Sequence, residues 1–264
     1  MRETVAVLRY AFLSGLQDYT TIYTWKTWLA GWLVRVVAQV SFFALFGELI
    51  GSSERTEFLV VGNAVLLAAL GVMFAVASTS WERWQGTFPL LVASPTAPVL
   101  VFLGRSTFWI PDAVASSVGT FFICAAIFDL PLPWPRVLLI MPLIVLIALS
   151  TYCLGIFLGG LVLRNPNLRN LVANLVWLTM AAIAGVNVPL SYDPEPLRWL
   201  AEVLPLTHGL QAVRGLLDGD PGHEIAVQAG AEAAVGVAFL VLAFLTFDRL
   251  AEHGRRDGTI EFGA

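Results

Sequence analysis

Three ionisable side chains lie inside long apolar runs of this 264-residue chain, where a charge is costly and often functional. They are Arg35, Asp112 and Glu232, and Gln39 follows Arg35 by four residues, which places both on one face of a helix. A membrane-embedded enzyme needs an acid, a base or a metal that converge at one depth. The three charges stand at different depths, and no cluster of His, Asp and Glu accompanies them. The sequence therefore predicts no catalytic residue and no metal site.

A second group of polar residues follows the second apolar run, within 81–95. Trp84 and Phe88 recur at helical spacing on an apolar face, while Glu82 and Arg83 present charge. A short amphipathic helix held against a membrane bundle can transmit motion from a soluble partner. An ordinary interfacial loop explains the same residues equally well on physical grounds.

Nucleotide chemistry is missing from the chain. Lys26 is the only lysine, and no Gly-x-x-x-x-Gly-Lys-Ser/Thr phosphate loop surrounds it. Any ATP hydrolysis, with its Mg²⁺, must therefore be supplied by another chain, and we expect no cofactor in this one. The net charge of −4 makes nucleic acid an improbable partner.

The elements that position these residues are membrane helices. Hydrophobic residues make up 58% of the chain and charged residues only 13%, whereas an ordinary soluble domain carries about 25% charged residues. A membrane span needs about 20 apolar residues of helix. Six runs satisfy this length, and they cover residues 27–47, 58–80, 106–128, 137–162, 171–191 and 225–247. We predict one all-α transmembrane domain over 1–264.

Positive charge predicts the orientation, because Lys and Arg concentrate in cytoplasmic segments. Ten of the 15 Lys and Arg residues fall in the segments that are cytoplasmic if the N-terminus is inside, four fall in the outer segments, and Arg35 lies in a span. We therefore expect a multi-pass protein of the cytoplasmic (inner) membrane with both termini in the cytoplasm.

The segments outside the spans also have distinct patterns. Residues 1–26 place Val5, Leu8 and Phe12 at helical spacing, which predicts an amphipathic helix in the membrane interface, either a simple anchor or a partner contact. The external segment 192–224 mixes apolar residues with prolines. Because irregular backbone is not tolerated in lipid, we predict short helices that enter the membrane from outside.

Two motifs carry a resemblance to a known family. The segment 82–95 has the pattern Glu-Arg-x-x-Gly-Thr-x-x-x-Leu-x-x-Ser-Pro. A second element runs from Gly-Val-x-x-Pro at 185–189 through Leu-Pro-Leu-Thr at 204–207 to Ala-Val-Arg-Gly-Leu-Leu at 212–217. Together, in this order, they resemble the ABC-2 type permease family, which comprises the membrane subunits of ABC exporters.

The resemblance implies a dimer of permeases, either identical or related, that binds two copies of a cytoplasmic ABC ATPase. It implies that the segment 81–105 contains a coupling helix against the ATPase. The residues matched or adjoining there are Trp81, Glu82, Arg83, Trp84, Gly86 and Thr87. It also implies re-entrant helices in the external segment, with Pro205, Leu206, Thr207 and Arg214 in the family pattern.

Each charge inside a span keeps two interpretations. Arg35 can extend to the inner surface or pair locally, or it can lie on a permease–permease or substrate surface. Asp112 needs a partner or a proton, and Arg105, two helical turns earlier, is a possible local partner. Glu232 lies near the outer end of its span, where it can reach water or, less readily, substrate.

The function expected from the resemblance is outward transport of an amphiphilic drug-like, lipid or glycan substrate, with membrane lipids around the chain. An ion-coupled secondary transporter is one alternative, although such proteins often show internal repeats and none is visible in this sequence. A membrane-embedded enzyme is the other.

Overall fold

The computed structural model describes residues 2–77, 98–162 and 166–257, and every regular element within them is a helix. The prediction of an all-α chain is therefore confirmed for these residues. Five helices or helix pairs are long and apolar enough to cross a membrane, which confirms a multi-pass membrane protein. They cover Trp25–Ile50, Ser53–Ala77, Val99–Ile127, Arg136–Val162 and Gly222–Arg249.

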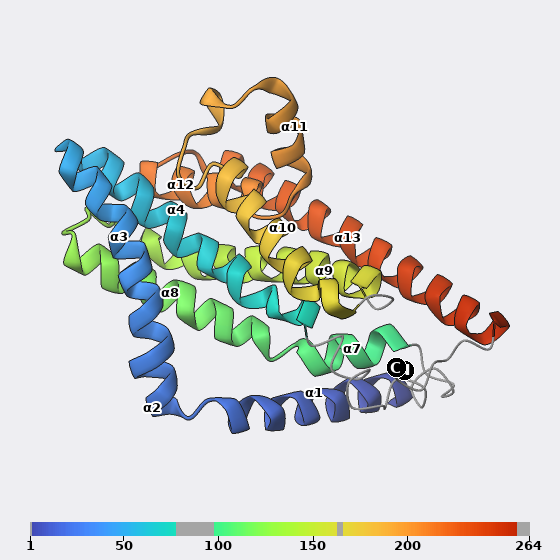
Figure 1. Cartoon of the computed structure of the whole chain (residues 1–264). Helices are drawn as coiled ribbons and strands as arrows, with labels where there is room; N and C mark the ends of the chain where they lie inside the picture. Colours follow the sequence, from blue (N-terminus) through green and yellow to red (C-terminus); the bar gives the residue numbers. More distant parts are fainter. Residues whose placement is uncertain (1, 78–97, 163–165, 258–264) are drawn as a thin grey trace.

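The N-terminal segment is a helix, α1 (Arg2–Ile22), that runs beside α7 (Pro98–Ser106) on one side of the bundle (Figure 1). Glycines allow this close approach. A Cβ atom at Gly15 would overlap the Arg105 carbonyl, and one at Gly104 would lie 2.7 Å from the Ala11 Cβ. The predicted helix over 1–26 is thus present, and a short α2 (Trp25–Thr27) follows it.

The first span combines α2, a π-helical stretch η1 (Trp28–Leu33) and α3 (Val34–Ile50). Gly51, with φ +72°, ends α3 because only glycine adopts this conformation without strain. Ser52 then caps α4 (Ser53–Val72) by accepting a hydrogen bond from the Arg55 backbone N–H. This tight turn joins the first two spans.

The third span differs from the predicted 106–128. Its apolar helix begins at α7, breaks at Thr107 and continues as α8 (Trp109–Ile127). Pro111 explains the break, because it lacks the N–H that would bond the carbonyl of Thr107. Residues 98–105, which were predicted as part of the coupling segment, therefore belong to this span.

The fifth predicted run is wrong in extent. Instead of a helix over 171–191, the chain forms α10 (Arg169–Ile183), whose 15 residues rise only about 22 Å against a hydrocarbon core of about 30 Å. The helix stops before Gly185, which has φ +79°. The chain then turns through a short 3-10 helix, η4 (Leu190–Tyr192).

The segment 192–224, predicted to be external, contains two short helices, α11 (Glu195–Val203) and α12 (Thr207–Asp218). In Figure 1, α11 stands at the side of the bundle opposite α1, whereas α12 packs against α9 (Ile140–Val162) and the long α13 (Gly222–Asp257). Short helices are present as expected, while their entry into the membrane from outside stays a prediction. The last helix, α13, extends beyond the predicted 225–247 at both ends.

The core lies around α4, which packs against α3, α8 and α9. Small residues such as Gly71, whose Cβ would overlap Ala113 of α8, permit this close packing. By contrast, α3 exposes Phe42, Leu45 and Leu49. Such an apolar face is stable only in lipid or against another protein surface.

Candidate functional site

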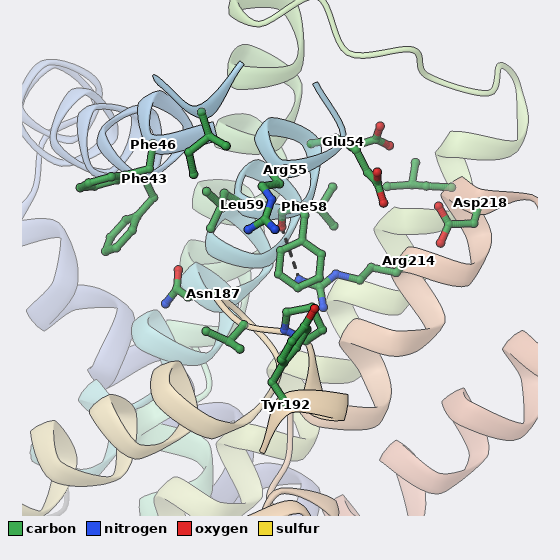
Figure 2. Close-up of a pocket in the computed structure, with 16 residues that line it drawn as sticks. Phe43, Phe46, Glu54, Arg55, Phe58, Leu59, Asn187, Tyr192, Arg214 and Asp218 are labelled. Carbon is green, nitrogen blue, oxygen red and sulfur yellow. Dashed lines mark hydrogen bonds between the residues drawn. The ribbon is translucent and has the colours of Figure 1, made fainter. Parts of the chain in front are cut away.

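The described part of the chain contains a groove of about 850 Å³. It lies between the end of α3, the start of α4, the link 187–192 and the end of α12 (Figure 2). This volume falls in the range of small-molecule sites, about 300–1,000 Å³. Glu54, Arg55 and Tyr192 are exposed at its edge, so the groove is open to the surface.

Aromatic side chains form one part of the groove. Phe43 and Phe46 come from α3, Phe58 from α4 and Tyr192 from the link. Phe42, which is exposed beside them, packs edge-on against Phe46 with ring centroids 5.2 Å apart. Figure 2 shows Phe43 and Phe46 on one side of the groove, with Phe58 near its centre.

Carboxylates gather at another part of the groove. Glu54 and Glu57 lie in the first turns of α4, and Asp218 ends α12. Glu57 is half-buried and close enough to the other two to interact with them electrostatically. Figure 2 places Glu54 and Asp218 on the side away from Phe43 and Phe46. The groove is therefore amphipathic.

Arg214 has a mainly structural role in the groove, because its guanidinium binds backbone carbonyls. One of its terminal nitrogens, Nη1, donates to the Gly185 carbonyl at 2.6 Å, and Nη2 donates to the carbonyls of Val186 and Phe58. Its guanidinium also lies 3.6 Å from the Phe58 ring centroid, a cation–π geometry. Burial lowers the pKa of Arg214 to about 10, so it remains charged at neutral pH. Arg214 thus ties α12 to the bend after α10.

A pair of asparagines holds the same bend against α4. Asn63, which is buried, donates its side-chain amide to the Asn187 Oδ1 at 2.9 Å and to the Leu59 carbonyl at 3.0 Å. Asn187 in turn donates to the Ala181 carbonyl. One wall of the groove is therefore fixed by polar side chains between residues far apart in sequence.

Glu232 does not reach water, which corrects the prediction that it could. Its side chain is 0% exposed. One carboxylate oxygen accepts from the Leu206 backbone N–H at 2.9 Å and from the Ser150 hydroxyl, and the other accepts from the Gly209 N–H at 3.0 Å. Glu232 therefore satisfies the free N–H groups at the start of α12, where negative charge is also favoured by the helix dipole.

The motif residues around this turn are structural. Leu206 has φ +87°, which is unusual for a residue with a side chain. The hydroxyl of Thr207 donates to the Ala201 carbonyl at 2.7 Å, and Pro205 is buried beside it. These contacts close the turn between α11 and α12 and leave none of the three in the groove.

Asp112 has partners other than the predicted Arg105. Its Oδ1 accepts from the Tyr19 hydroxyl at 2.5 Å and from the Trp28 indole N–H at 2.6 Å. Arg105 instead forms an ion pair with Asp18 of α1 at 2.7 Å. The local pairing was wrong because α1 lies against α7 and α8 and supplies closer groups.

Arg35 and Gln39 also lie away from the groove. Arg35 is exposed, and its guanidinium lies 5.1 Å from the Trp32 ring centroid. Gln39 is half-buried one turn later. The four polar residues predicted inside the spans therefore do not converge. Among the described residues, no group of three or more His, Cys, Asp and Glu could hold a metal ion.

The predicted coupling residues lie outside the described residues. They are Trp81, Glu82, Arg83, Trp84, Gly86 and Thr87. Their contact with an ATPase stays a prediction.

Comparison with known families decides the class of the protein. A model described as "ABC-2 type transporter" matches residues 13–217, which is most of the chain. The chain belongs to the ABC-2 type transporter family. As an ABC-2 chain it is a membrane component of an ABC transporter, and this membership implies association with an ABC ATPase subunit. No curated protein sequence gave a significant match.

The groove of this ABC-2 chain does not follow from its sequence. Glu54, Glu57 and Asp218 were not singled out. A positional signal was available, since the first two residues begin an apolar helix and the third ends an amphipathic stretch before the last span. Their proximity, however, depends on the bend at Gly185 and on Arg214.

Proposed function

We propose that this chain is the permease subunit of an ABC exporter that moves an amphiphilic drug-like, lipid or glycan substrate outward across the cytoplasmic membrane. A separate ATPase, present in two copies with ATP and Mg²⁺, supplies the energy. Family membership and the lack of a phosphate loop support this division of labour. The single observation that carries the substrate role is the amphipathic groove of about 850 Å³.

We also propose that a second permease, identical or related, covers the exposed face of α3. Phe42 is 58% exposed and Leu49 is 82% exposed there, next to the groove that Phe43 and Phe46 line. A partner on this face would extend the groove into a pathway between two subunits. The remaining apolar surface contacts lipid.

The proposed topology has six spans within one transmembrane domain, with both termini in the cytoplasm. The short α10, continued by the buried bend at 184–186, serves as the fifth span. The helices α11 and α12 cover the outer end of the bundle as re-entrant helices. The burial of Leu210, Val213 and Leu216 on α12 supports this placement. The ten-to-four distribution of positive charge supports the orientation.

Topology can be tested by labelling with an impermeant thiol reagent after Cys124 and Cys153 are replaced. Single cysteines at Ser52 or Glu195 should react from outside, and single cysteines at Gln85 or Gly258 should react only after permeabilisation. The opposite pattern would contradict the orientation.

Function is tested by co-expression with candidate ABC ATPases from the same genome and reconstitution in vesicles. We expect ATP-dependent uptake of an amphiphile into inside-out vesicles. Glu82→Arg should still fold but bind the ATPase at least about tenfold more weakly, because an interfacial charge that loses its partner costs about 2–5 kcal/mol. Gly230→Ala is the matched control, since its Cβ meets nothing within 4 Å.

The outcomes separate the alternatives. Uptake that needs an ion gradient and no ATPase would indicate a secondary transporter, and turnover of the substrate would indicate an enzyme. Normal ATPase binding and export by Glu82→Arg would refute the coupling role of that residue while leaving the exporter intact.

A further inference from the structure

We infer that the groove at the α3–α4 junction binds an amphiphilic cation, with its charge among Glu54, Glu57 and Asp218 and its apolar body against Phe43, Phe46 and Phe58. This inference rests on the proposed transport function and names the chemical class of its cargo. It commits to a small amphiphile and not to a protein segment.

The charge of the groove favours a cation. Three carboxylates and two guanidinium groups line it, which gives a formal charge of −1. Arg55 is exposed at the groove edge, whereas Arg214 donates to backbone carbonyls. Glu54 and Asp218 are exposed and Glu57 is half-buried. The carboxylates therefore present oxygen atoms that a ligand can approach.

Arg214 is less available to an anionic ligand than the carboxylates are to a cation. Both of its terminal nitrogens already donate to backbone carbonyls, and its face is against Phe58. Its Nε is buried from solvent and therefore also from a ligand. Asp218, four residues later on α12, lies close enough to interact with Arg214 electrostatically and is exposed. The charges that a ligand can approach are therefore Glu54, Glu57, Asp218 and the exposed Arg55.

The aromatic residues favour a ligand with an apolar body. Placing that body against the Phe side chains removes apolar surface from water, which is favourable. Phe43 and Phe46 lie on the side opposite Glu54 and Asp218, with Phe58 between them (Figure 2). A ligand with a positive group and an aromatic or aliphatic body would contact the carboxylate side and the aromatic side of the groove at once. A volume of about 850 Å³ is sufficient for a drug-sized molecule.

The test uses two probes of the same shape and opposite charge, tetraphenylphosphonium and tetraphenylborate. Binding is measured by equilibrium dialysis with the full-length protein in zwitterionic nanodiscs, and the uptake by empty nanodiscs is subtracted. No ATPase or ATP is present, so the result does not depend on coupling. We expect saturable binding of tetraphenylphosphonium, and no saturable binding of tetraphenylborate.

Variants assign the binding to the groove. The double variant Glu54→Gln with Glu57→Gln should weaken tetraphenylphosphonium binding at least about tenfold, because two nearby negative charges are lost. Phe46→Ala should weaken it less. The matched control is Glu195→Gln, which removes an exposed carboxylate of α11 that does not line the groove. Thermal unfolding midpoints near that of the wild type establish that the variants fold.

Several results would overturn the inference. One is tighter binding of tetraphenylborate, which indicates an anionic amphiphile. Others are no saturable binding of either probe, or cation binding that the double variant leaves unchanged. ATP-driven transport of another amphiphile can still succeed in each case, so failure here is distinct from failure of the proposed function.

Discussion

Two carboxylates inside apolar helices, Glu232 of α13 and Asp112 of α8, are satisfied in different ways. Glu232 accepts from two backbone N–H groups through its two oxygens, and a hydroxyl adds a third bond. Asp112 uses a single oxygen, which accepts from the side chains of Tyr19 and Trp28. The first carboxylate therefore determines the path of the backbone, whereas the second attaches one helix to another.

The difference has energetic consequences. Glu232 is completely buried. Removing its oxygens therefore leaves the N–H groups of Leu206 and Gly209 without an acceptor, because water does not reach them. A buried donor without a partner costs about 1–3 kcal/mol. Tyr19 is only partly buried, and a side chain can rotate toward water when its partner is lost. Comparing the two sites therefore distinguishes two losses of stability. One comes from backbone N–H donors left without an acceptor, and the other from side-chain donors left without one.

The largest expected effect is that of Glu232→Ala. It removes the acceptor for the N–H groups of Leu206 and Gly209 and leaves a cavity beside Ser150. We expect a loss of about 3 kcal/mol or more, which for a chain of this size lowers the Tm by about 6–12 °C. Thermal unfolding in detergent measures it. Asp112→Ala is the matched variant, and an equal or larger loss there would contradict the comparison.

The amide variants sharpen the comparison. In Glu232→Gln, one oxygen becomes an NH₂ group that faces a backbone donor, so we expect a loss of about 1–3 kcal/mol. In Asp112→Asn, the remaining oxygen can still accept from both Tyr19 and Trp28, with the amide nitrogen turned away. We expect a loss below about 1 kcal/mol there. Equal Tm shifts for the two variants would show that both oxygens of Asp112 are needed.

A smaller effect tests how closely α12 must approach α9. A Cβ atom at Gly209 would overlap the side chain of Ile147 and lie 3.3 Å from the Glu232 carboxylate carbon. Gly209→Ala should therefore displace the helix start and cost about 1–3 kcal/mol through overpacking. Gly230→Ala on α13, where nothing lies within 4 Å, is the control and should not lower the Tm. A tolerated Gly209→Ala would mean that Glu232 holds α12 without close packing.

The sequence predicted those features that depend on neighbouring residues. Apolar runs of sufficient length identified the four long spans that coincide with the predicted runs, and the proline-broken stretch 192–224 indicated short helices. Partners of the buried charges are distant: Ser150 is 82 residues from Glu232, and Tyr19 is 93 residues from Asp112. From the sequence, only Arg105 was near enough to be considered for Asp112, and it pairs with Asp18 instead.

The bounds of two spans could not be predicted from hydropathy, because they depend on the backbone conformation at particular residues. The third span began earlier because α7 joins α8 across the break that Pro111 causes, and α10 ended earlier at Gly185. The groove could not be predicted because its walls come from three segments far apart in sequence, 43–61, 187–192 and 214–218. Its assembly requires the contacts of Arg214 and Asn63 with the bend at 185–187.

A small and pH-dependent effect is expected of Tyr19→Phe, which removes one of the two donors to Asp112. A net loss of about 1 kcal/mol is expected at neutral pH. Burial and, to a lesser degree, the hydrogen bond to Asp112 raise the pKa of the Tyr19 hydroxyl above its usual value. A raised pKa in the folded state means that the stabilisation is complete below the unfolded pKa, and it is lost as pH rises through the folded one.

The difference in Tm between wild type and Tyr19→Phe should therefore stay constant up to pH 9 and shrink above about pH 10, where tyrosine in the unfolded chain ionises. Ionisation of the other tyrosines affects both proteins equally and cancels in this difference. A difference that grows with alkaline pH would mean that the phenolate of Tyr19 is stabilised in the fold, and Asp112 could not then be its partner.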